Sequence, residues 1–139
     1  ILFTVQPPEV ANCMVAYLKS LKPVPSPRLV KGQLSVAAKR GGRVFRDPEV
    51  GCTKCHVAPL FTDLKSYDVG TAGPLDREVK EFDTPTLVEI WRTAPYLHDG
   101  SATSVRDVLT TANPRDQHGK TSQLTADQLN DLIEYLLSL

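Results

Sequence analysis

The residues with the clearest capacity for chemistry are two cysteines and a histidine in the run Cys52-Thr53-Lys54-Cys55-His56. This spacing sets the two thiols about one helical turn apart, where both can bond the vinyl groups of one haem while the adjacent imidazole faces the iron. Cys-x-x-Cys-His is the signature of c-type haem attachment, and histidine is a common proximal ligand. The run predicts one covalent haem c held by Cys52, Cys55 and His56.

Other interpretations of the run fit less well. A zinc site would need a second pair of ligands, and the remaining cysteine, Cys13, stands alone. A thioredoxin-like redox site would follow a strand in a βαβ unit, whereas a glycine-rich helix is expected here. Pro59 follows His56 by three residues, and its carbonyl could fix the imidazole tautomer from outside the ligand shell.

The bulk composition limits the function classes. The chain has 139 residues with 16 acidic and 16 basic side chains, so it can form one domain with a core and offers no basic surface for nucleic acid. It lacks an apolar run of about 18 residues that could span a membrane. It begins at Ile1 with no signal peptide, and we interpret it as a mature product, an excised domain or a fragment.

Periodicity indicates an all-α domain with long loops. No convincing period-two alternation is present, and turn-forming residues dominate 57–84. Ser35 and Thr125 are expected as helix N-caps. The expected helices span 8–21, 35–46, 85–93, 104–111 and 126–138.

The two end helices resemble each other. Residues 16–21 (AYLKSL) match residues 134–139 (EYLLSL) at an offset of 118 residues, which suggests tandem units. On this view 1–30 is the closing helix of a preceding unit with a proline-rich linker, and 31–139 is the cytochrome-like domain. The alternative is that two amphipathic helices share a common pattern. Cys13 is expected to be a buried small hydrophobe on the first helix.

The order of motifs resembles the class I cytochrome c plan. A helix with Gly42-x-x-Phe45 precedes the Cys-x-x-Cys-His run, and a closing helix carries Tyr135-Leu136. In that family the first and last helices cross at a glycine/aromatic contact. The resemblance therefore implies contacts between the two helices, with Leu132, Tyr135 and Leu136 meeting Gly41, Gly42 and Phe45.

A longer motif is similar to the C-terminal haem domain of bacterial di-haem cytochrome c peroxidases and their methylamine-utilisation relatives. It consists of Thr84–Leu87 and the run Thr93–Ser101, and the two resemblances together cover about 34–139. The chain departs from the pattern at Val88-Glu89, where Arg-Asn is usual. It also has Ala112 where peroxidase relatives place the methionine that is the sixth iron ligand.

The far side of the iron is therefore open to several candidates. His118 lies in the polar loop near where relatives supply their ligand, although a solvated loop residue is the ordinary alternative. In relatives the residue at His98 lies beside the haem without binding iron. Met14, a group from another domain, or an open or water-bound iron complete the alternatives.

Other residues gain roles from the resemblance. Arg92 could pair with a haem propionate or be a surface arginine. The Trp91 indole could donate to the other propionate or fill the core. Relatives bind calcium between two haem domains, partly through carbonyls at the positions of Thr93 and Pro95. We interpret these 139 residues as one such domain without its partner, so the resemblance implies calcium less strongly than haem.

The expected function is electron transfer by an extracytoplasmic haem c domain. Its partner would be a redox protein or a second haem domain, as in di-haem peroxidases. The main alternative is a catalytic haem with an open sixth position that acts on peroxide. A third is an interaction module in which haem only stabilises the fold.

Overall fold

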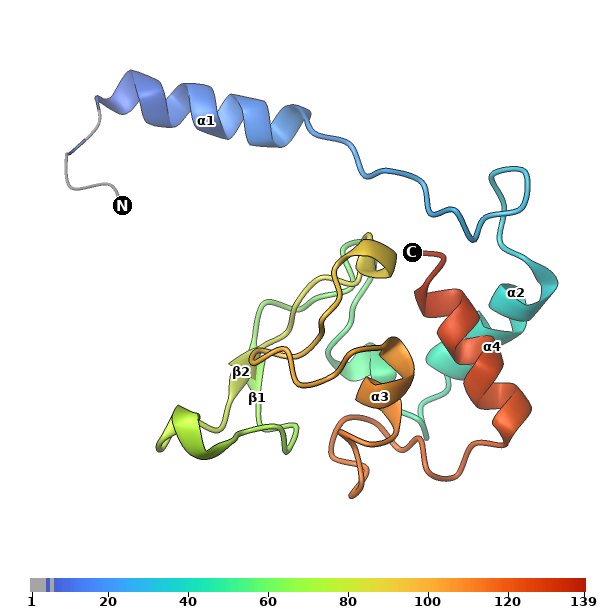
Figure 1. Ribbon diagram of the computed structural model, residues 1–139. Coiled ribbons are helices and arrows are strands. Elements are labelled where there is room, and N and C mark those ends of the chain that lie inside the picture. The colour runs from blue at the N-terminus through green and yellow to red at the C-terminus, as the bar shows by residue number, and fades with distance from the viewer. Residues whose placement is uncertain (1–4, 6) are drawn as a thin grey trace.

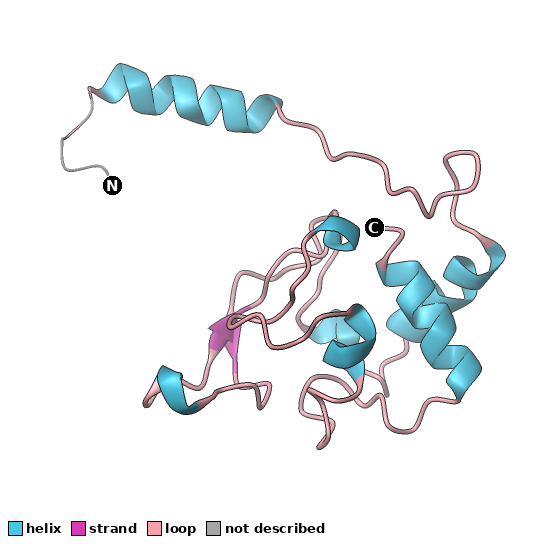
Figure 2. Ribbon diagram, in the orientation of Figure 1, coloured by secondary structure: helices cyan, strands magenta, loops and turns pink. Residues whose placement is uncertain are grey.

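The computed structural model describes Val5 and residues 7–139. Its helices are α1 (Pro8–Ser20), α2 (Val36–Phe45), α3 (Val105–Leu109) and α4 (Ala126–Leu136) (Figure 1). Long loops with three short 3-10 turns, at Cys52–Lys54, Pro74–Asp76 and Ile90–Arg92, join them (Figure 2). Within this described part, no helix has the length and apolar character needed to cross a membrane.

Two local predictions differ from the structure. The helix predicted over 85–93 is only the turn Ile90–Arg92, because Glu89 adopts a left-handed conformation (φ 63°) that a longer helix cannot contain. A small antiparallel ribbon, β1 (Ser66–Tyr67) with β2 (Phe82–Asp83), was not predicted. Its two-residue strands are too short to produce a detectable alternation.

The crossing of α2 and α4 forms the centre of the core, as predicted. A Cβ atom at Gly41 would lie 1.8 Å from the carbonyl oxygen of Asp131, so only glycine fits there. At Gly42 a Cβ would lie 3.1 Å from the ring of Tyr135. The Tyr135 ring also packs on Phe45, with ring centroids 5.3 Å apart.

Both helices begin at the predicted caps, since Ser35 Oγ accepts from Ala38 N at 3.0 Å and Thr125 forms a capping box with Gln128. The Cys-x-x-Cys-His run begins at Cys52, after the end of α2 at Phe45, and Cys52 packs against the core. The buried apolar cluster consists of Ala38, Phe45, Leu87, Val105, Leu109, Leu132, Tyr135 and Leu136.

α1 forms as predicted but stands away from this core (Figure 1). All its residues are exposed, including Tyr17 and Leu18 on the apolar face. The prediction that Cys13 is buried is wrong, because Cys13 is exposed. Within the described residues, nothing packs against the face on which Cys13 was expected to be covered.

The connector after α1 is attached to the domain. The backbone N–H of Val24 donates to the Glu89 carboxylate. Ser26 Oγ donates to the Leu137 carbonyl at 2.5 Å, and Arg28 pairs with Glu134 at 3.0 Å. The connector therefore lies along the C-terminal end of α4.

Candidate haem site

The Cys-x-x-Cys-His run lies in a short 3-10 turn, Cys52–Lys54, preceded by Gly51 at φ 86°. Cys52 and Cys55 are both free thiols. Burial raises the pKa of Cys52 to about 11 and also raises that of Cys55. Both thiols are therefore protonated at neutral pH.

One ring nitrogen of His56 is held by the backbone. Its Nδ1 lies 2.9 Å from the Phe61 carbonyl oxygen, and because a carbonyl can only accept, Nδ1 carries the proton. The prediction that Pro59 supplies this carbonyl is incorrect. The turn closed by Thr62 N on Val57 O, with Phe61 at φ 54°, directs the Phe61 carbonyl back to the ring. Burial lowers the pKa of His56, which keeps the imidazole neutral.

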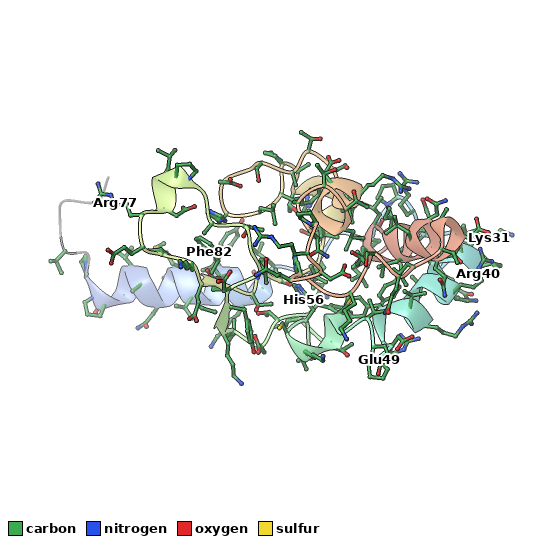
Figure 3. All side chains as sticks on the ribbon, turned by 90° about the horizontal axis from the view of Figure 1, so that it is seen from below. Lys31, Arg40, Glu49, His56, Arg77 and Phe82 are labelled. Carbon is green, nitrogen blue, oxygen red and sulfur yellow. The ribbon has the colours of Figure 1, made fainter. Side chains whose placement is uncertain are left out.

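The ring of His118 lies close to the ring of His56, which Figure 3 labels. The two ring centroids are 6.2 Å apart, with ring planes inclined by 35°. A transition metal binds an imidazole nitrogen at about 2 Å, so two imidazoles on opposite sides of one metal have ring centres about 6 Å apart. The observed spacing matches that arrangement.

The electrostatics of His118 also suit a metal ligand. Its Nδ1 is buried without a hydrogen-bond partner among the described residues. Burial, followed by the charge of His56, lowers the pKa of His118 to about 4. A buried imidazole that is neutral at pH 7 is the form that binds metals. Two thiols and two opposed neutral imidazoles fit a haem c.

Arg92 and Trp91 lie together in the turn Ile90–Arg92. The guanidinium of Arg92 pairs with Glu89 and lies 5.7 Å from the centroid of the Trp91 ring. Trp91 Nε1 is buried without a partner among the described residues. This nitrogen is a donor available to an anionic group, whereas Arg92 already has a carboxylate.

His98 and Phe45 occupy other positions around the site. His98 Nε2 lies 3.0 Å from an Asp76 carboxylate oxygen, and its ring stacks on Phe82 at a centroid distance of 3.6 Å. Phe45 contacts Phe61 edge-on at 5.9 Å. Phe45 thus connects the helix crossing to the residue whose carbonyl orients His56.

Sequence reasoning missed Phe61, Asp76 and Asn113. Phe61 acts through its backbone, which no side-chain pattern reports. Asp76 is 22 residues from the histidine that it contacts. For Asn113 the sequence contains one indication, because the Asn113-Pro114 pair favours a turn at the start of the loop that carries His118.

The comparisons with known proteins show what the domain is similar to. A family model described as RoxA-like, cytochrome c-like matches residues 82–118. A crystal structure of hydrazine synthase from Kuenenia stuttgartiensis aligns with a TM-score of 0.82 at 33% identity, covering 96% of this chain and 56% of that one. This chain carries a cytochrome c-like domain. The family implies covalent haem c.

Curated proteins similar to this cytochrome c-like domain include an enzyme subunit, a methylamine utilization protein and a cytochrome-c peroxidase. Hydrazine synthase subunit gamma of K. stuttgartiensis is 36% identical over 92% of this chain and 48% of the relative. The methylamine utilization protein MauG of Methylophilus methylotrophus is 32% identical over 76% of this chain and 37% of the relative. The cytochrome-c peroxidase IdrP1 of Pseudomonas sp. (strain SCT) is 27% identical over 78% of this chain and 41% of the relative.

The chain spans less than half the length of these curated relatives. A MauG-like protein associated with microbial copper homeostasis, at 21% identity and a TM-score of 0.62, shares the fold.

Proposed function

We propose that this cytochrome c-like domain transfers electrons through one haem c, with His56 and His118 as the two axial ligands. The observation that carries the proposal is the 6.2 Å separation of the two rings, combined with the buried, unpartnered nitrogen of His118. Ala112 stands where the resemblance places a methionine ligand. Methionine raises the reduction potential of haem, so we expect a lower potential than in methionine-ligated relatives.

The residues of this chain would hold the group and keep its surroundings constant. When bound, the haem supplies a reversible one-electron couple. Cys52 and Cys55 would attach it, and the Phe61 carbonyl keeps the His56 proton on Nδ1, so that Nε2 is the nitrogen that would bind the iron. His118 would supply the second iron ligand, and with both ligands in place a small molecule would have no free iron position. Trp91 Nε1 is the donor we assign to a propionate.

The test replaces His118 in the haem-loaded chain. We expect an intact mass for one haem and a low-spin ferric spectrum that cyanide and CO barely change. His118→Ala should convert the spectrum to high-spin and open the iron to cyanide, whereas the control His98→Ala should leave the low-spin spectrum unchanged. If His118→Ala keeps the low-spin spectrum, His118 is not the ligand.

A catalytic haem acting on peroxide is the second candidate. It is favoured by similarity to a protein named cytochrome-c peroxidase and to MauG. This function needs an open sixth position. A high-spin ferric spectrum in the unmodified chain, shifted readily by cyanide, would select it over the electron carrier.

We also propose that α1 is the closing helix of a preceding haem unit, with the domain boundary near residue 30, in an extracytoplasmic protein. The sequence match with α4 places Met14, Tyr17 and Leu18 in register with Leu132, Tyr135 and Leu136, which are buried in α4. The same side chains in α1 are exposed. A second unit with its own glycine-bearing helix would cover them, and its haem would be the redox partner.

A further inference from the structure

The loop that carries His118 is held by one buried amide. Asn113 is 4% exposed. Its Oδ1 accepts from the backbone N–H of His118 at 2.8 Å. Its Nδ2 donates toward the carbonyl oxygens of His118 (3.2 Å) and Gly119 (2.8 Å) and toward Thr121 Oγ1 (3.0 Å). Both ends of one amide thus bond the backbone on both sides of the His118 side chain.

The same loop is also fastened to the segment that precedes the haem-binding cysteines. Lys120 N donates to the carbonyl oxygen of Val50 at 2.9 Å, and Val50 is 2% exposed. Gly119 adopts φ 80°, and a Cβ there would lie 3.2 Å from the same oxygen. Val50 stands two residues before Cys52, so the two sides of the haem site are joined by a direct backbone contact.

The far end of the loop is closed by two more side chains. Thr121 Oγ1 donates to the Leu109 carbonyl at 2.6 Å, which anchors the loop to the end of α3. Asp116 Oδ1 accepts from the backbone N–H groups of Thr121 and Ser122, both at 3.0 Å. His118 therefore sits in a short segment whose backbone is bonded before, at and after the histidine.

We propose that Asn113 is the positioning residue of the sixth ligand. It holds the His118 backbone so that the imidazole stands opposite His56 independently of the haem, and the ligand stays in place when the iron changes charge. This inference rests on the proposed ligation by His118. A loop histidine that had to be ordered by the metal would lose conformational freedom at each binding event, and residues that orient a ligand avoid that loss.

The chemistry of the amide makes the inference specific. Asn113→Asp keeps the shape and the acceptor oxygen but removes both N–H donors. A carboxylate oxygen would then face the carbonyl oxygens of His118 and Gly119, which repels the backbone on the C-terminal side of the ligand. Asn113→Ala removes all four contacts and leaves the buried His118 N–H without its acceptor.

The experiment measures cyanide binding and spin state on the haem-loaded full chain. In Asn113→Asp we expect cyanide to bind at least about tenfold faster than in the unmodified protein, because losing a residue that orients a metal ligand weakens metal binding by about 10–100-fold. A high-spin ferric fraction that grows with temperature should accompany it. Asn130→Asp, an exposed asparagine on α4, is the matched control and should change neither.

Each outcome separates the two claims. If His118→Ala opens the iron but folded Asn113→Asp and Asn113→Ala bind cyanide as slowly as the unmodified protein, Asn113 does not position the ligand and the ligation proposal stands. If His118→Ala leaves the iron low-spin, both proposals fall. Asn113→Ser, which puts one hydroxyl in place of the amide, replaces the alanine variant if that variant does not fold, and should bind cyanide faster than the control.

Discussion

α1 and α4 share a sequence pattern, yet one is exposed and the other is buried. Leu132, Tyr135 and Leu136 of α4 are covered by α2, whereas Met14, Tyr17 and Leu18 are exposed at the matching positions of α1. The decisive difference lies in the partner: Gly41 and Gly42 let α2 approach α4 closely. An amphipathic pattern therefore predicts that the apolar face of a helix will be covered, but it does not predict which element covers it.

The comparison is sharpest at the pair Leu132 and Met14. Leu132 is 0% exposed and Met14 is 57% exposed. Leu132→Ala should lower the free energy of unfolding by about 2–5 kcal/mol through lost burial and a cavity, whereas Met14→Ala should change it by less than about 0.5 kcal/mol. Urea unfolding of the two haem-loaded variants measures both. Equal effects would mean that α1 packs on the domain in solution.

Acid should affect α4 through a contact that α1 lacks. Asp131 accepts two bonds from Arg40, at 2.5 and 2.6 Å, and this contact lowers the pKa of Asp131. Cys13 stands at the corresponding position of α1. A lowered pKa stabilises the fold fully above the unfolded-state value of about 4, and this stabilisation is lost as pH falls through the folded-state value.

Arg40→Gln should therefore be less stable than the unmodified protein at pH 7, with the difference shrinking as pH falls below about 4. Urea unfolding at several pH values measures this difference, in which acid effects common to both proteins cancel. A difference that stays constant with pH would show that Arg40 acts by packing alone.

The smallest expected effect concerns α1 itself. Deleting residues 1–20 should leave the unfolding midpoint and the haem spectrum unchanged, because every residue of α1 is exposed. Cys13 should react with a maleimide at the rate of a small free thiol. A chain with a preceding unit should protect Cys13 if that unit covers α1, and unchanged labelling there would contradict the tandem proposal.

Much of the fold follows from the sequence because its signals are local. The caps Ser35 and Thr125 and the glycine pair in α2 each act within a few residues of their position or through a single close contact. The carbonyl that orients His56 was misassigned, because the path of a loop decides whether Pro59 or Phe61 faces the ring. The 6.2 Å spacing of the two histidines joins residues 62 positions apart, which no local pattern encodes.

The attachment of the connector limits how far α1 can lie from the domain. Val24 is the first connector residue bonded to the domain, and α1 ends at Ser20. Four residue steps span at most about 14 Å when fully extended. A unit joined to α1 would therefore be linked to this domain by a connector of about that length, which is attached near the C-terminal end of the chain. Electron tunnelling weakens steeply with distance. So short a connector would keep a neighbouring redox centre close enough for electron transfer without a large interface.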